Sequence, residues 1–312
     1  MKKQIPYKVL LIFLFLIAGI SIGGYFYFRY AKQSYRIEID HQLCVIAELK
    51  VKQIVEWRRE RLTDASLFYK NDLFSGLVQN YFKNPHDPVS SKHIRELLLK
   101  IKQYHDYENI FLIDLHGVNR FSIPTPAAPV SSIISSHVPE IIKSKQIIFE
   151  DFYRDETDGQ IYLCMCVPII DVQDSSRVLG MLALQIDPKL YLYPFINTWP
   201  TPSRTSEILI VRKEGDDVLF LNDLRFDTNT ALALRIPLKR IEVPGVRAAL
   251  GWQGSFEGID FNGVPVIAAV RPIPNSPWGM VARMDISEAF APLKKQLLIL
   301  AIPSGILLIS LF

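Results

Sequence analysis

The residue types suited to binding a small charged molecule gather between residues 107 and 162. A guanidinium fork pairs well with a carboxylate, and aromatic side chains form the apolar walls of small-molecule pockets. Alternate residues of a strand share a face, so Asp151 and Tyr153 point together while Phe152 points away. Taken singly, each such residue also fits a surface charge or a core aromatic. The candidate ligand-binding residues are Tyr107, Phe111, Arg120, Asp151, Tyr153, Asp155 and Tyr162, with Arg154 beside them.

Residue patterns for catalysis and metal binding are missing from the sequence. It contains no H-E-x-x-H, no G-x-S-x-G and no phosphate-binding loop, and its six histidines lack metal-ligand spacing. Cys164 and Cys166 lie on a predicted strand and share one face, with Cys44 left over. Buried free thiols fit this pattern better than a disulfide or a metal site. We therefore expect no catalytic residue, no metal and no cofactor.

Composition restricts the class of protein. Hydrophobic residues make up 49% of the 312-residue chain, so a sizeable core is expected and a disordered chain is not. The formal net charge is +3, with both signs mixed along the sequence. A nucleic-acid-binding protein would show a clustered basic surface, so no nucleic acid is expected as a partner.

Both ends of the chain carry long apolar segments. Residues 9–28 hold no charge and, at 1.5 Å per residue, span about 30 Å, the thickness of the hydrocarbon core of a bilayer. Residues 1–8 contain three lysines and form the predicted cytoplasmic tail. The alternative for this end is a cleavable signal peptide. Residues 297–312 are also uncharged, and we interpret them as the start of a second transmembrane helix that is cut short. The alternative there is a buried C-terminal helix or strand.

The first segment continues into a predicted stalk helix over residues 31–70. This stretch has no proline or glycine, and its apolar residues recur every three or four positions. Its densest charge run is Trp57-Arg58-Arg59-Glu60-Arg61. That run fits a solvated face with i,i+4 ion pairs. The alternative is that Arg58 or Arg61 points into a pocket for an anionic ligand.

The remaining sequence predicts two modules built on antiparallel sheets, which makes the fold class α+β. The first module, over 71–193, starts with a helix at 91–105 and then alternates strands with turns. A proline-rich linker at 194–205 precedes the second module at 206–285, where Asn262-Gly263 marks a hairpin. Residues 286–296 form the return helix. The predicted strands are 109–113, 118–123, 147–153, 160–170 and 178–186, then 206–212, 218–222, 254–261, 264–271 and 278–285.

Four stretches of the chain resemble a known receptor type. They are IVEWRRERLTDA (54–65), the run from LYPFINTWP to LNDLR (192–225), FEGIDFNGVPVIAAVRPIPNSPWGMVARMD (256–285) and EAFAPLKK (288–295). The match is to the double Cache (PAS-like) extracytoplasmic sensor region of bacterial PAS-containing sensor histidine kinases and related diguanylate cyclases. The resemblance implies that the membrane-distal module holds a small carboxylate, an amino acid or a related metabolite. It also implies that the proximal module couples this ligand to the second transmembrane helix.

The sequence thus predicts a ligand-sensing region in the periplasm or outside the cell, anchored in the inner membrane. Its expected partners are a small-molecule ligand, the membrane and a second copy, joined through the stalk and transmembrane helices. The expected output is a histidine kinase or a GGDEF-type enzyme past Phe312. The alternatives are the sensor domain of a chemoreceptor, and a non-signalling membrane-anchored binding protein whose chain ends at Phe312.

Overall fold

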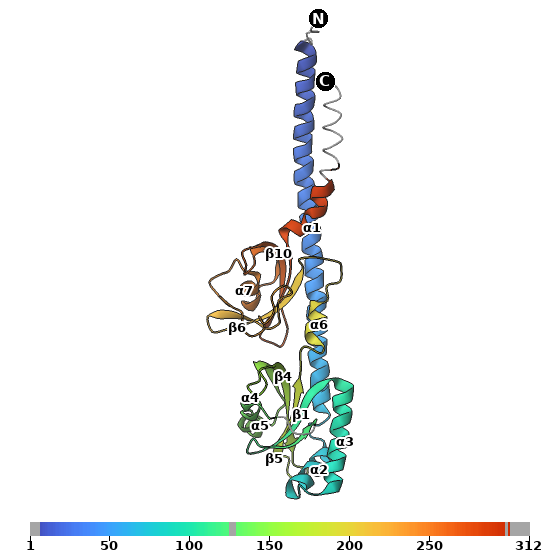
Figure 1. The fold of residues 1–312 in the computed structure, drawn as a ribbon, viewed down its shortest axis with the longest axis vertical. Coiled ribbons are helices and arrows are strands. Elements are labelled where there is room, and N and C mark those ends of the chain that lie inside the picture. Colours follow the sequence, from blue (N-terminus) through green and yellow to red (C-terminus); the bar gives the residue numbers. More distant parts are fainter. Residues whose placement is uncertain (1–6, 125–128, 297–298, 300–312) are drawn as a thin grey trace.

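One long helix organises the computed structural model, which describes residues 7–124, 129–296 and 299. Helix α1 (Tyr7–Ser66) has 60 residues, and at 1.5 Å per residue it is about 90 Å long. Figure 1 shows it as a rod along which the other elements hang. The long N-terminal helix expected from the sequence is confirmed, but it ends at Ser66 and not at the predicted residue 70.

Two shorter helices follow α1 and fold back beside its far end. The chain reverses through residues 67–70, where Lys70 has a positive φ of 54°. Asn71 then caps α2 (Asp72–Lys83) by accepting a hydrogen bond from the backbone N–H of Phe74. Asp87 caps α3 (Pro88–His105) in the same way, and this helix therefore begins ahead of the predicted residue 91.

The first sheet belongs to what we call the distal module (71–193 in the predicted division). It has five antiparallel strands in the spatial order β2-β1-β5-β4-β3. Helices α1 to α3 lie on one face, and α4 and α5 on the other (Figure 1). Strands β4 and β5 are buried along their whole length, which explains their nearly continuous apolar sequences. The elements are β1 (Tyr107–Asp114), β2 (Asn119–Ile123), α4 (Ser132–Ser135), α5 (Val138–Ser144), β3 (Ile148–Arg154), β4 (Ile161–Ile170) and β5 (Val178–Ile186).

The second sheet belongs to the proximal module (206–285 in the predicted division). It has six antiparallel strands in the order β8-β7-β6-β11-β10-β9. Gly263, with φ of 87°, makes the predicted turn between β9 and β10. Its elements are β6 (Glu207–Glu214), β7 (Asp217–Phe220), β8 (Arg235–Pro237), α7 (Pro244–Ala249), β9 (Gly254–Ile259), β10 (Pro265–Pro272) and β11 (Trp278–Asp285). Before it, α6 (Leu192–Asn197) leads into the linker, and after it α8 (Ile286–Ala289) begins the return helix.

A single apolar core connects α1 with both sheets. Ile54 and Trp57 of α1 are buried in it together with Leu163 of β4 and Met280 of β11. Closer to the N-terminal end of α1, a separate cluster joins Leu43 to β10, β11 and the start of the return helix. Both modules therefore pack on one helix. The two predicted antiparallel sheets are confirmed, while the exact module boundaries stay predictions.

Of the two predicted membrane segments, the first lies within the described residues and the second lies almost entirely outside them. Residues 9–28 belong to α1, whereas 297–312 fall outside the described part of the chain except for Ile299. Within the described ranges, no helix has the combination of length and apolar character that crossing a bilayer requires.

The packing of α7 against β11 gives a test of the fold. A Cβ on Gly279 would lie 2.5 Å from the carbonyl oxygen of Ala248 in α7. We expect Gly279→Ala to lower the free energy of unfolding by about 1–3 kcal/mol, because backbone atoms must move apart. The matched control is Gly76→Ala inside α2, where a Cβ meets no atom within 4 Å. It should raise stability by roughly 0.5–1 kcal/mol through helix propensity. Urea denaturation of both variants measures the two effects, and equal midpoints would contradict this packing.

Candidate functional site

A buried amide marks the centre of the distal sheet. Gln185 lies on β5, which is flanked by β1 and β4, and its side chain is 1% exposed. A polar side chain in such a place is costly unless it is hydrogen-bonded. Asn109 Nδ2 on β1 donates to Gln185 Oε1 at 2.7 Å. Gln185 Nε2 donates to the hydroxyl of Tyr153 at 2.9 Å and to Asp155 Oδ2 at 3.1 Å. We call these four residues the Gln185 cluster.

The Gln185 cluster includes a carboxylate in an unusual situation. Asp155 is 2% exposed, and its Oδ1 accepts from the N–H and the hydroxyl of Thr157 at 2.9 and 2.7 Å. All of these donors are neutral. Among the described residues, no Lys, Arg or His forms an ion pair with Asp155. Burying a carboxylate without a cation is expensive, so this site is chemically suited to receive an ammonium group.

Tyr153 of the cluster lies beside a second tyrosine, Tyr162, on the face covered by α4 and α5. The rings of Tyr153 and Tyr162 lie 6.4 Å apart between centroids, and both belong to the apolar layer that also holds Phe111. The hydroxyl of Tyr162 donates to Asp158 Oδ2 at 2.8 Å. Burial raises the pKa of Tyr153 and of Tyr162 far above the usual value for a phenol. Both hydroxyls therefore stay protonated and act as neutral hydrogen-bonding groups.

One histidine and two cysteines lie on the same α4–α5 side of the distal sheet. His137, at the start of α5, contacts Glu150 of β3 through Nε2 at 2.6 Å. This hydrogen bond raises the pKa of His137 to about 9, so the imidazole is positively charged at neutral pH. Cys164 and Cys166 are buried and free, with their sulfur atoms 3.9 Å apart. Burial raises the pKa of Cys164 well above that of a free thiol, so the thiol is unreactive.

The structure divides the residues that the sequence singled out. Phe111, Tyr153 and Tyr162 share the α4–α5 face. Asp155 is linked to Tyr153 through Gln185, whose amide donates to both. Tyr107 belongs to the opposite face, where its hydroxyl donates to Asp64 of α1 at 3.3 Å. Burial raises the pKa of this tyrosine too.

Three other predicted residues also lie away from the cluster. Asp151 accepts from Arg212 and from the indole of Trp278 at the contact between the two modules. Arg154 donates to the carbonyl oxygens of Gly159 and Ala231. Arg120 lies in a separate pocket.

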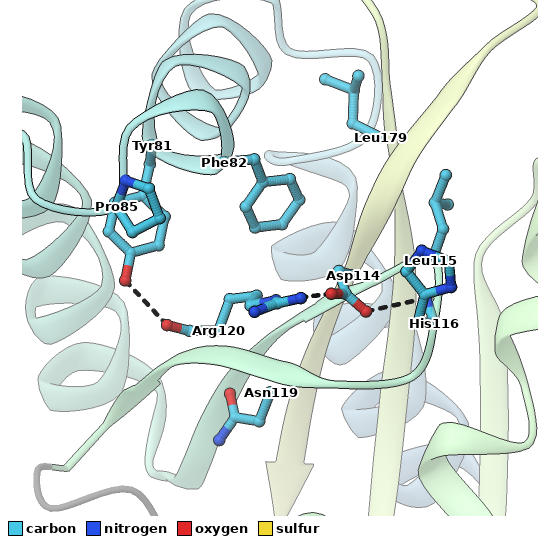
Figure 2. Close-up of a pocket in the computed structure, with 9 residues that line it drawn as sticks. All are labelled: Tyr81, Phe82, Pro85, Asp114, Leu115, His116, Asn119, Arg120 and Leu179. Atoms are coloured by element: carbon cyan, nitrogen blue, oxygen red, sulfur yellow. Dashed lines mark hydrogen bonds and ion pairs between the residues drawn. The ribbon is translucent and has the colours of Figure 1, made fainter.

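That separate pocket lies between the end of α2 and the β1–β2 turn (Figure 2). It has a volume of about 500 Å³. Arg120 Nε donates to Asp114 Oδ2 at 2.6 Å, and Tyr81 donates to the carbonyl oxygen of Arg120 at 2.8 Å. Figure 2 shows the guanidinium directed at Asp114. Since Asp114 already neutralises Arg120, this pocket is a weaker candidate for an anionic ligand than the sequence suggested.

Sequence reasoning missed the centre of the site. Gln185 and Asn109 were not among the candidates, although each interrupts an apolar strand with an amide. In the strand VLGMLALQI (178–186), glutamine is the single side chain that can both donate and accept hydrogen bonds. A polar residue inside a fully buried strand is the signal that would have identified it.

Comparisons with known proteins agree with this architecture. A family model described as the Cache domain matches residues 32–293. The ligand-binding domain of the Pseudomonas fluorescens chemoreceptor CtaA, solved with L-isoleucine, is 15% identical with a TM-score of 0.53, covering 84% of this chain and 98% of that one. The ligand-binding domain of Mlp24 with asparagine is 14% identical with a TM-score of 0.56, covering 84% and 99%.

A third solved structure extends the same result. The ligand-binding domain of the Pseudomonas aeruginosa PAO1 amino acid chemoreceptor PctB, in complex with L-Arg, is 14% identical with a TM-score of 0.52, covering 81% of this chain and 98% of that one. A search of curated proteins finds no match. At these identities the solved structures show a shared fold.

The His137–Glu150 pair predicts a pH dependence of stability. The pKa of His137 in the folded state, about 9, lies above the pKa of about 6.5 for a histidine in the unfolded chain. The pair therefore stabilises the fold fully below pH ~6.5, and this contribution is lost as the pH rises toward and through ~9. We expect the free energy of unfolding to fall by on the order of 1–3 kcal/mol over that window, and Glu150→Gln to remove most of this slope. NMR titration of the imidazole provides the direct measurement. A midpoint near 6.5 in the unaltered chain would contradict the pairing.

Proposed function

The chain belongs to the Cache domain family, a family of sensor domains, and we propose that it is the ligand-sensing region of a membrane-bound receptor. In this proposal the ligand is a small metabolite and binds on the α4–α5 face of the distal module, at the Gln185 cluster. The module would lie in the periplasm or outside the cell, with the chain anchored in the inner membrane through residues 9–28.

The observation that supports this location most strongly is the buried carboxylate of Asp155. It has only neutral donors around it among the described residues. An ammonium group would replace the missing countercharge and gain a charge-assisted hydrogen bond. Tyr153 and Gln185 add neutral groups that fix the orientation of a ligand, and the apolar layer provides the walls that small-molecule sites require.

This chemistry favours an amino-acid-like ligand over a simple carboxylate. A carboxylate alone would face the negative charge of Asp155, whereas an amino acid presents an ammonium group to it. His137 of the same face is already paired with Glu150 and Glu140, so the proposal assigns no countercharge to the carboxylate of the amino acid. The solved Cache-type domains with L-isoleucine, asparagine and L-Arg are consistent with this ligand class.

Signalling in this proposal requires the ligand to prefer one of two conformations. Helices α4 and α5 lie on the face of the distal sheet that holds Tyr153, so in this proposal ligand entry moves them relative to the sheet. The change passes through the proximal module to α8 and the second transmembrane segment. The output is a histidine kinase or a GGDEF-type enzyme. A chemoreceptor output is the alternative from the same architecture, and a non-signalling membrane-anchored binding protein is the third possibility.

A homodimer along the stalk is part of the same proposal. Ile37, Val45 and Leu49 recur at multiples of four residues on α1, and their side chains are 62%, 50% and 48% exposed. Val45 and Leu49 lie one turn apart on one side of the helix, and Ile37 lies about two turns before Val45, so the three form an apolar stripe that winds gradually around α1. A second copy of the chain would bury this stripe.

Thermal shift of the 312-residue chain against the twenty L-amino acids tests the ligand and its site. At saturating concentration a bound amino acid should raise the unfolding midpoint by mass action. Asp155→Asn should abolish this rise, because the countercharge for the ammonium group is removed. Tyr153→Phe should lower the affinity roughly three- to tenfold, as expected for one lost hydrogen bond.

Two variants control for indirect effects. Tyr193→Phe also deletes a buried hydroxyl, one that donates to the carbonyl oxygen of Leu221 near the linker, and should leave affinity unchanged. Arg120→Ala alters the separate pocket of Figure 2 and should also retain binding. An unchanged response in Asp155→Asn, or no response to any amino acid in the unaltered chain, would refute the proposal.

A further inference from the structure

Arg58 of α1 lies where the stalk and both modules meet. Its guanidinium carbon is 5.0 Å from the ring centroid of Phe149 in β3 and 5.0 Å from that of Trp278 in β11. Its Nη1 donates to the carbonyl oxygen of Asn275, in the β10–β11 connection, at 2.7 Å. One side chain therefore contacts the stalk, the distal module and the proximal module together.

A pocket of about 260 Å³ opens beside this arginine. Its walls are mainly apolar, and its two charged residues are Arg58 and Arg59. This volume exceeds the roughly 150 Å³ cavity that accommodates benzene in an engineered protein. The lining residues are Val55, Arg58, Arg59, Leu62, Phe149, Met165, Pro274 and Asn275.

The two arginines of the pocket differ in how their charges are compensated. Arg59 forms a two-pronged contact with Glu56 on the same helix, including Nε to Oε2 at 3.0 Å, and is neutralised there. Within the described ranges, no carboxylate oxygen lies within ion-pair distance of Arg58. The nearby carboxylate of Asp151 is already held by Arg212 Nη1 at 2.8 Å and Trp278 Nε1 at 2.8 Å.

The environment of Arg58 penalises its charge. Burial lowers the pKa of Arg58, and only the attraction of Asp151 opposes this effect. Its guanidinium donates to neutral carbonyl oxygens, those of Pro274 and Asn275. An anion that meets the guanidinium would form charge-assisted hydrogen bonds and offset the cost of burial.

We propose that this junction pocket is a second ligand site, which binds a small organic anion with an apolar ring or chain. The carboxylate of the anion meets Arg58, and its apolar part lies against Leu62, Phe149 and Met165. This site is separate from the Gln185 cluster and does not depend on it.

The other arginine that the sequence singled out has a different role. Arg61 donates to the carbonyl oxygen of His105 and pairs with Asp64 at 3.4 Å, so it ties α1 to α3. The sequence left open whether Arg58 or Arg61 points into a pocket for an anion. In this proposal that arginine is Arg58.

Occupation of the junction pocket has a consequence for the whole molecule. The ligand would contact α1, β3 and the β10–β11 connection at once. It would therefore favour the arrangement of the modules in which these three surfaces are close together, and this preference is what allows a ligand to shift a conformational equilibrium. A junction ligand would modulate how strongly the distal module is coupled to the proximal one.

Fluorine NMR with 4-fluorobenzoate and its neutral analogue 4-fluorobenzamide tests this site on the 312-residue chain in detergent. We expect binding of the benzoate at millimolar or lower concentration and at least about tenfold weaker binding of the amide, because a charge-assisted hydrogen bond is lost. Arg58→Gln should reduce the affinity for the benzoate by a similar factor.

The chain offers a matched control for the arginine. Arg247 also lies between two aromatic rings, Trp252 and Phe256, and also donates to a backbone carbonyl, that of Ile241 at 2.7 Å. It is not among the residues that line the junction pocket. Arg247→Gln should leave the binding of the benzoate unchanged. Comparing this variant with Arg58→Gln in the same detergent corrects for benzoate that partitions into the micelles.

A second variant keeps the proposal testable if Arg58→Gln fails to fold. Leu62 is 49% exposed at the edge of the pocket, so Leu62→Trp fills the pocket from the solvent side and should block the benzoate. Retained affinity in Arg58→Gln or in Leu62→Trp, or equal binding of benzoate and benzamide, would overturn the proposal. Because Asp155→Asn leaves the junction untouched, benzoate binding should persist in that variant.

Discussion

The packing of both sheets on one helix is the constraint on which the rest of the structure depends. Helix α1 completes the core of both modules, since its Ile54 and Trp57 enter the same core as strands from both modules. Non-directional burial of apolar surface fixes the separation of the modules from the helix but not their rotation about it. Directional contacts must supply that rotation.

Buried and half-buried polar groups provide these directional contacts. At the junction, Asp151 of the distal module joins Arg212 and Trp278 of the proximal module. Inside the proximal module, Arg283 is 5% exposed and bonds Glu207 and Asp260, which ties β11 to β6 and to the turn before β10. Such networks contribute modestly to net stability, but each unpaired member would be costly, so they disfavour alternative arrangements.

Much of the architecture followed from local sequence patterns, whereas the site did not. The long helix was predictable from a stretch without proline or glycine, and the β9–β10 turn from Asn262-Gly263, because these signals act over a few residues. The residues of the Gln185 cluster come from β1, β3, the turn after β3, and β5. Their meeting depends on the strand order and register of the sheet, which join residues as far apart in sequence as Asn109 and Gln185. For the same reason, the sequence alone did not separate Arg120 and Asp151, which pair with Asp114 and Arg212, from the residues of the cluster.

The position of the return helix beside α1 has a further consequence. Ala289 and Phe290 pack in one cluster with Ile39 and Leu43 of α1. The chain therefore leaves the proximal module beside the same helix on which both modules pack. A movement of the whole molecule displaces α1 and α8 together, so the position of α8 relative to α1 does not change. Only a movement of the modules relative to α1 changes the position of α8 relative to α1. In the proposed receptor, α1 would therefore be the reference against which a displacement of α8 is measured, and motions shared by both helices would carry no signal.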